Sequence, residues 1–196
     1  MVAHRRTRDR CCRLDQVASA SSLGVYAASP RLCEVDVSGI ASAALAANKG
    51  VFYPRVMTNS IGDGGSGDDD HHRPPRMLFL SPDDGMEPSS FGISEPVERA
   101  PRAPGDGGCA LDVIIVPGLA FDRRCGRLGR GGGFYDAFFE RCAQWTSGGG
   151  DRRRPYLVGV CFEEQIVSAV VREGWDVPVD VVVTPSAVFF HTGGVS

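Results

Sequence analysis

The chain has 196 residues, a formal charge of −3 at pH 7 and 42% hydrophobic residues. This length supports one hydrophobic core, so we expect one domain, and the acidic balance excludes a bulk attraction to nucleic acid. No apolar run approaches the roughly twenty residues of a membrane span. The seven cysteines are an odd number without a C-x-x-C pair, which favours free thiols in a reducing compartment over a disulfide framework or a zinc site.

The first 22 residues are rich in arginine and end in small residues. This composition is somewhat like that of a transit peptide, although Asp9 and Asp15 argue against one. We interpret residues 1–22 as a disordered basic tail, residues 23–190 as a single domain and residues 191–196 as a second tail.

Several elements are expected before the middle of the chain. Apolar runs predict strands over residues 23–28, 51–56 and 76–80. Apolar residues at i, i+3, i+4 spacing over residues 37–45 predict a helix, which Asp36 or Ser38 can cap.

Residues 60–75 are polar and of low complexity, so they predict a loop. The Asp-Asp-Asp-His-His run at 68–72 could be imagined as a metal cluster. Adjacent side chains point in different directions, however, and nothing nearby fixes them, so a solvated loop is the favoured interpretation.

The most informative stretch runs from Asp112 to Cys142. Its apolar start predicts a buried parallel strand that ends at Pro117-Gly118. A glycine-rich loop follows Arg127-Leu128, and its glycines are Gly129, Gly131, Gly132 and Gly133. A helix comes next, because its apolar residues have i, i+3, i+4, i+7 spacing: Tyr135, Phe138, Phe139 and Cys142.

A loop of this kind can bind phosphate. Successive backbone N–H groups form an anion-binding nest, and the positive end of the next helix reinforces it. Arg127 and Arg130 add guanidinium groups, which suit phosphate oxygens. The loop has neither the dinucleotide fingerprint nor a Walker motif, so a mere tight connection between strand and helix is an equally good interpretation of the loop alone.

The last third of the chain predicts a strand over residues 155–162, a helix over 163–171 and a further strand at 181–185. The basic run at 152–154 raises the question of RNA binding, but interleaved aromatic residues and a basic face are lacking. The alternation of strands and helices predicts an α/β sheet with ligands at the carboxyl ends of its strands.

The run VPGLAFDRRCGRLGRGGGFYD resembles the signature segment of 5-formyltetrahydrofolate cyclo-ligases. The EVD segment before the alanine-rich helix, with Lys49 and VFYPRV after it, is similar to another pattern of that family. The resemblance implies a three-layer α/β/α sandwich with a mostly parallel central sheet. It also implies closure of 5-formyltetrahydrofolate to 5,10-methenyltetrahydrofolate, with ATP as co-substrate and Mg²⁺ as cofactor. Phe91 and Ile93 in SSFGISEP could pack on the folate rings, and core packing is an equally good account of them.

The same resemblance assigns roles to individual residues. It implies that Asp136 and Asp176 hold Mg²⁺ and that Arg130 and Tyr135 take part in catalysis. The implied ATP-binding residues are Arg127, Leu128, Gly129, Arg130, Gly131, Gly132, Gly133, Phe134 and Tyr135. The implied folate-binding residues are Glu34, Arg130, Gly131, Gly132, Gly133 and Phe134.

The chain also departs from the family's pattern. Relatives open with a K-x-x-x-R helix that contacts ATP, whereas Arg6 and Arg10 have this separation here but lie too close to the first expected strand. Phe134 stands where tyrosine is more common, and Gly132 where some relatives have lysine. An incorrect start, a missing coding segment and a genuine loss of part of the ATP site all stay open. The alternative function is therefore an impaired relative that binds reduced folate without turnover. We expect a monomer in the cytoplasm, with the mitochondrion as the other compartment, and no nucleic-acid or membrane partner.

Overall fold

The computed structural model describes residues 2–29, 34–57, 76–89, 92–150, 152–174 and 176–192. A seven-stranded sheet with the order β12-β11-β9-β6-β1-β2-β3 forms its centre. The five inner strands are parallel and the two edge strands are antiparallel. The bounds, in sheet order, are Val188–Phe190, Val181–Val183, Tyr156–Val160, Val113–Val116, Ser22–Gly24, Gly50–Val56 and Met77–Leu80.

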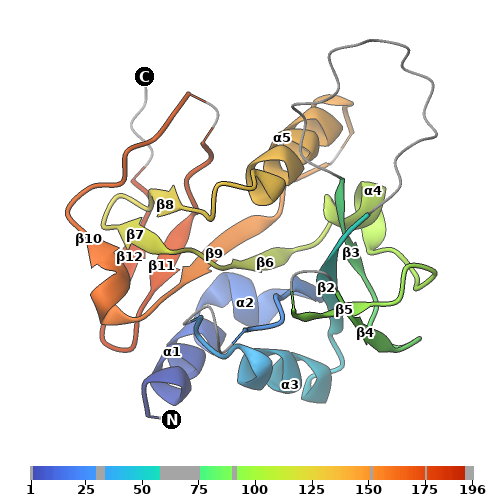
Figure 1. Cartoon of the computed structure of the whole chain (residues 1–196), viewed down its shortest axis with the longest axis horizontal. Helices are drawn as coiled ribbons and strands as arrows, with labels where there is room; N and C mark the ends of the chain where they lie inside the picture. The colour runs from blue at the N-terminus through green and yellow to red at the C-terminus, as the bar shows by residue number, and fades with distance from the viewer. Residues whose placement is uncertain are drawn as a thin grey trace.

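Helices cover both faces of this sheet, so the expected three-layer α/β/α fold is confirmed (Figure 1). One face carries α1 (Val2–Cys12), α2 (Asp15–Ser19) and α3 (Ser38–Ala46), and the other carries α5 (Phe134–Ser147). The short α4 (Pro104–Gly108) packs beside β3 at the edge of the sheet. Within the part of the chain that the structure describes, no helix has the length and apolar character needed to cross a bilayer.

The strands bury both of their faces, which is why they appear as continuous apolar runs in the sequence. In β6, Val113 and Ile115 belong to the core beneath α1 to α3. Ile114 and Val116 alternate with them and join Phe138 of α5 in the opposite core. The sheet therefore separates two apolar cores, and α5 is anchored on one of them.

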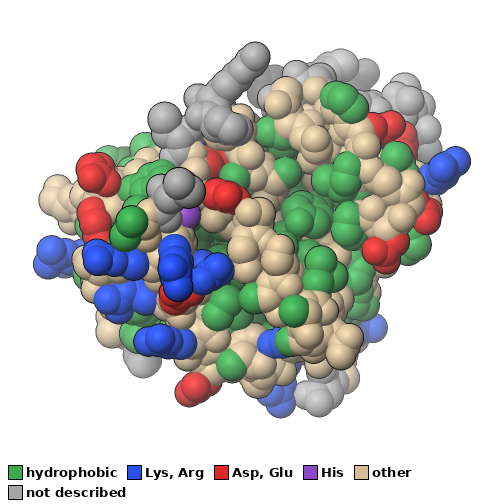
Figure 2. All heavy atoms as spheres, turned by 90° about the horizontal axis from the view of Figure 1, so that it is seen from below, with side chains coloured by type: hydrophobic (Ala, Val, Ile, Leu, Met, Phe, Trp, Pro, Cys, Tyr) green, Lys and Arg blue, Asp and Glu red, His purple; other side chains and the backbone are tan. Residues whose placement is uncertain are grey.

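The N-terminal segment is not a disordered tail, contrary to our interpretation of residues 1–22. α1 buries Thr7 and Cys11 completely, and the Nε of Arg10 donates a hydrogen bond of 3.0 Å to the carbonyl of Pro185. Lys49 Nζ donates to the carbonyls of Val17 and Ala18, which holds α2 in place. Figure 2 shows the face of the molecule seen from below, where Lys and Arg side chains gather toward one side.

Two small sheets accompany the central one. The first has the order β10-β7-β8 and the second pairs β4 with β5. The bounds of these strands, β4, β5, β7, β8 and β10, are Met86–Pro88, Ser94–Pro96, Ala120–Asp122, Arg127–Leu128 and Ile166–Val167.

The predicted helix over residues 163–171 is wrong. Only a 3₁₀ turn forms, η3 (Glu163–Gln165), and β10 follows it at once. The side chain of Gln165 accepts the N–H of Phe162 and donates to the carbonyls of Gly118 and Leu119. These long-range bonds, together with the pairing of β10 to β7, satisfy backbone and side-chain groups in a way that a helix here would not. The expected loop at 60–75, Phe91 and most of the 191–196 tail lie outside the described residues.

Candidate active site

A cavity of about 1350 Å³ lies between the glycine-rich loop, the start of α5 and the segments that follow β1 and β6. Tyr26 and Ala27 follow β1, and Pro117 and Gly118 follow β6. The cavity thus lies at the carboxyl ends of these strands, where ligands are expected. The residues to which the resemblance assigns a catalytic, ATP-binding, folate-binding or metal-binding role all line this cavity: Glu34, Arg127, Leu128, Gly129, Arg130, Gly131, Gly132, Gly133, Phe134, Tyr135, Asp136 and Asp176.

The glycine-rich loop needs glycine for its backbone conformation. Gly131 and Gly133 have φ values of 80° and 65°, a region that other residues enter only at a cost. Gly133 is the N-cap of α5 in the left-handed conformation, and no side chain caps the helix there. The first N–H groups and the positive end of α5 therefore lie at the wall of the cavity.

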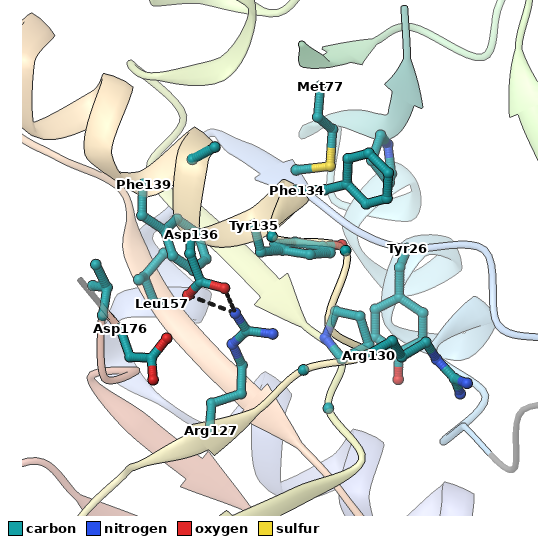
Figure 3. A pocket seen from close by; sticks show the side chains of 18 of the residues that line it. Tyr26, Met77, Arg127, Arg130, Phe134, Tyr135, Asp136, Phe139, Leu157 and Asp176 are labelled. Carbon is teal, nitrogen blue, oxygen red and sulfur yellow. Dashed lines mark hydrogen bonds and ion pairs between the residues drawn. The ribbon is translucent and has the colours of Figure 1, made fainter. Parts of the chain in front are cut away.

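Arg127 and Asp136 form an ion pair across this loop (Figure 3). One Nη of Arg127, on β8, donates to both carboxylate oxygens of Asp136, on α5, at 2.8 and 2.9 Å. The guanidinium also lies over the rings of Tyr135 and Phe139, 5.6 and 6.0 Å from their centroids. Arg127, which we expect to bind phosphate, and Asp136, which we expect to bind the metal, thus contact each other.

A second ion pair joins Arg130 to Glu34. Their nearest nitrogen and oxygen are 3.7 Å apart, and the carboxylate also accepts the N–H of Ser29 at 3.0 Å. The side chain of Glu34 is only 10% exposed, whereas that of Arg130 is 43% exposed. Glu34 is thus held at the cavity wall by a backbone donor and faces a basic residue of the loop.

Tyr135 places a phenol in the apolar part of the cavity, beside Phe134 and Met77 (Figure 3). Its hydroxyl is buried and has no hydrogen-bond partner among the described residues. Burial raises the pKa of this phenol, so it is a neutral donor at physiological pH. A buried donor without a partner is unusual and suits an acceptor on a ligand.

Asp176 lies beside Arg127 in the cavity (Figure 3), and one of its oxygens accepts the N–H of Glu173 at 2.7 Å. Within the described ranges, no group of three His, Cys, Asp or Glu side chains is arranged to hold a metal. A divalent ion at Asp136 and Asp176 would therefore need oxygens from a ligand or water. Mg²⁺ is bound in this way, by one or two carboxylates with phosphate oxygens, so the residues fit it.

Sequence reasoning missed several residues of the cavity. Glu95 on β5 is buried and lines it, and burial raises the pKa of its carboxyl group. Arg154, which the sequence showed only as part of the basic run at 152–154, also lines the cavity and is held by two hydrogen bonds of 2.5 and 2.7 Å to Asp180. The SSFGISEP segment already pointed to the neighbourhood of Glu95. Nothing local distinguishes Arg154 from the arginines before it.

This arrangement defines a three-layer α/β protein with a cavity at a glycine-rich loop, and comparison with known proteins shows its family. Residues 1–185 match the model of the 5-formyltetrahydrofolate cyclo-ligase family, and the chain belongs to that family.

Named relatives agree with the family. The 5-formyltetrahydrofolate cyclo-ligase of Saccharomyces cerevisiae is 33% identical over 140 residues, which are 68% of this chain and 61% of the yeast protein. The mitochondrial one of Arabidopsis thaliana is 32% identical over 184 residues, which are 87% of this chain and 61% of that protein. The chain thus spans about three-fifths of these two relatives. The solved structure of Aquifex aeolicus 5,10-methenyltetrahydrofolate synthetase superposes with a TM-score of 0.67 at 27% identity, covering 98% of this chain and 83% of that one.

Proposed function

We propose that this protein converts 5-formyltetrahydrofolate to 5,10-methenyltetrahydrofolate with the consumption of ATP. The observation that carries the proposal is the meeting of the glycine-rich loop, two arginines, two aspartates and Glu34 on one cavity. The family and the names of the relatives support the folate substrate. The use of ATP and Mg²⁺ and the release of ADP and phosphate are not named by the relatives. This part of the proposal therefore rests on the residues of the cavity.

The chemistry needs an activated formyl oxygen, because an amide-like oxygen is a poor leaving group. The terminal phosphoryl group of ATP is transferred to this oxygen and ADP leaves. The neighbouring N-10 then attacks the formyl carbon, which closes the ring, and it gives up its proton to water. The C–O bond breaks to release phosphate. Such a transfer depends mainly on positioning and on neutralising charge.

The residues of the cavity supply these two effects. Arg127, Arg130 and the amides of Gly131–Gly133 hold the phosphates at the positive end of α5. Mg²⁺ held by Asp136 and Asp176 would neutralise phosphate charge. The carboxylate of Glu34 accepts hydrogen bonds from the aminopyrimidinone edge of the folate, and the Tyr135 hydroxyl donates to the ligand.

Absorbance of methenyltetrahydrofolate tests the proposal directly. Purified protein is mixed with 5-formyltetrahydrofolate, ATP and Mg²⁺, and we expect product only when all three are present. Asp176→Asn should lower the rate by at least about 100-fold, since charge stabilisation of this kind is worth that much. Arg152→Gln is the matched control, because Arg152 is exposed and contacts Trp145 rather than the cavity. Product formation without ATP would refute the proposal.

A folate-binding relative without turnover is the second candidate. One observation favours it: among the described residues that line the cavity, none belongs to α1, which carries Arg6 and Arg10. Binding of 5-formyltetrahydrofolate without any product, in the assay above, would establish this alternative.

A further inference from the structure

The Arg127–Asp136 ion pair presents a conflict with the roles proposed for its members. Arg127 is to hold phosphate and Asp136 is to hold Mg²⁺, yet their opposite charges are paired with each other. One Nη of the guanidinium serves both carboxylate oxygens. This Nη and both carboxylate oxygens become fully available to a ligand only when the pair opens.

The pair is also shielded from water. The side chain of Arg127 is only 5% exposed and that of Asp136 is 22% exposed. A buried charge that loses its partner is strongly unfavourable unless another charge replaces it. The rings of Tyr135 and Phe139 lie near the guanidinium, but they compensate only part of a full positive charge.

Each ligand alone is opposed by one member of the pair. A divalent cation that binds Asp136 by itself comes to lie beside the guanidinium of Arg127, which repels it. A metal-free nucleotide that binds Arg127 by itself places phosphate beside the carboxylate of Asp136. Only when metal and nucleotide bind together does each charge find a new partner of opposite sign.

We propose that the Arg127–Asp136 pair is exchanged when the site is loaded: Asp136 passes from the guanidinium to the metal, and Arg127 passes from the carboxylate to a phosphate oxygen. Arg127 thereby keeps the metal site closed until the nucleotide arrives. This inference rests on the proposed function of the same site. It assigns the pair a linking role, in which metal and nucleotide each favour the binding of the other.

The first half of the proposal is that Arg127 opposes metal binding at Asp136. It is tested by measuring the affinity for Mn²⁺ by electron paramagnetic resonance in the absence of nucleotide. Arg127→Gln removes the competing guanidinium and leaves Asp136 available, so the affinity for Mn²⁺ should rise about tenfold, a typical size for coupling between two ligand sites. Arg154→Gln is the matched control, because it removes a positive charge from the same cavity but its ion pair is with Asp180 and not with Asp136. We expect its Mn²⁺ affinity to change less than about threefold.

The second half of the proposal is that Asp136 opposes phosphate binding at Arg127. It is tested by measuring the affinity for a non-hydrolysable ATP analogue in the presence of EDTA. Asp136→Asn removes the carboxylate that repels phosphate and frees Arg127, so the metal-free affinity should rise about tenfold. This variant also keeps the inference testable if Arg127→Gln does not fold, which circular dichroism would reveal.

Three outcomes would overturn the inference. The first is unchanged or weaker Mn²⁺ binding in folded Arg127→Gln, which would mean that Arg127 orients Asp136 for the metal. The second is an equal gain in Arg154→Gln, which would indicate a general field effect. The third is an unchanged or weaker metal-free affinity in Asp136→Asn. None of these measurements requires turnover, so the exchange and the cyclisation are tested separately.

Discussion

The guanidinium of Arg130 lies 3.7 Å from the carboxylate of Glu34, so the glycine-rich loop is joined to the segment that precedes α3. Arg130 belongs to the proposed phosphate site and Glu34 to the proposed folate site. The contact therefore spans the boundary between the two substrates. Because Arg130 is 43% exposed, the pair itself contributes no more than about 1 kcal/mol to stability.

Glu34→Gln should separate folate binding from nucleotide binding. The variant keeps one acceptor oxygen but loses the negative charge, and a charged acceptor is worth about 1.5–3 kcal/mol. We expect the affinity for 5-formyltetrahydrofolate to fall at least about tenfold, while that for the ATP analogue changes less than about threefold. Isothermal titration calorimetry measures both. An equal loss for the two ligands would contradict the assignment of Glu34 to the folate.

Tyr135→Phe should stabilise the protein and impair catalysis. Its hydroxyl is buried without a partner among the described residues, and such a group costs about 1–3 kcal/mol. We expect the free energy of unfolding in urea to rise by about 1 kcal/mol and the rate of cyclisation to fall.

Tyr26→Phe is the matched control for that prediction. The hydroxyl of Tyr26 donates to the carbonyl of Val35 at 2.8 Å, so its removal should destabilise the protein by about 1 kcal/mol. A Tyr135→Phe variant with unchanged turnover would show that the hydroxyl does not contact the substrates.

Asp122→Asn should alter the dependence of the protein's stability on pH. Burial acts to raise the pKa of Asp122, but the N–H groups of Val170, Gly126 and Arg124 outweigh it, and the pKa is lowered below 3.8. A lowered pKa in the folded state contributes stability that is present above the unfolded value and is lost as the pH falls through the folded one.

Thermal melting between pH 7 and pH 3 measures this difference. Asn cannot accept at both oxygen positions, so Asp122→Asn should be less stable than the wild type at pH 7 by about 1–3 kcal/mol. The two melting temperatures should converge toward pH 3. Curves that stay parallel over this range would exclude the ionised carboxylate as the cause.

Gly133→Ala should strain the start of α5. Gly133 has a φ of 65° and a ψ of 3°, and an alanine in this left-handed region costs about 1–2 kcal/mol. Asparagine enters this region more readily, so Gly133→Asn should lose less stability than Gly133→Ala in urea unfolding. Equal losses for the two variants would mean that space at the loop, and not the backbone conformation, requires glycine.

α5 could be predicted from the sequence because its signal is local. The apolar spacing at Tyr135, Phe138, Phe139 and Cys142 lies within three helical turns, and three of these residues are buried as expected. α1 could not, because it buries only Thr7 and Cys11 and shows no continuous apolar stripe. The two-residue strand β8 is too short for any periodicity.

The sequence indicated many of the residues that line the cavity, but not Glu95, Arg154 or the contacts between the lining residues. The glycines and arginines stand out by residue type in one run of sequence, whereas Glu34, Asp136 and Asp176 were assigned by resemblance. The pairing of Arg127 with Asp136, and of Arg130 with Glu34, depends on how β8, α5 and the segment before α3 meet in space. Residue spacing along the chain carries no information of that kind.

The place of β1 in the sheet has a consequence for how the chain acquires its structure. β1 lies between β2 and β6, and its partner residues in β6, Val113 and Ile114, are distant in sequence. Such pairing needs closure of a long loop, which is slow and leaves strand edges uncovered in the meantime. During synthesis, one edge of β1 therefore has no strand to pair with until β6 has been made. We therefore expect slow refolding from urea, with aggregation that increases with protein concentration.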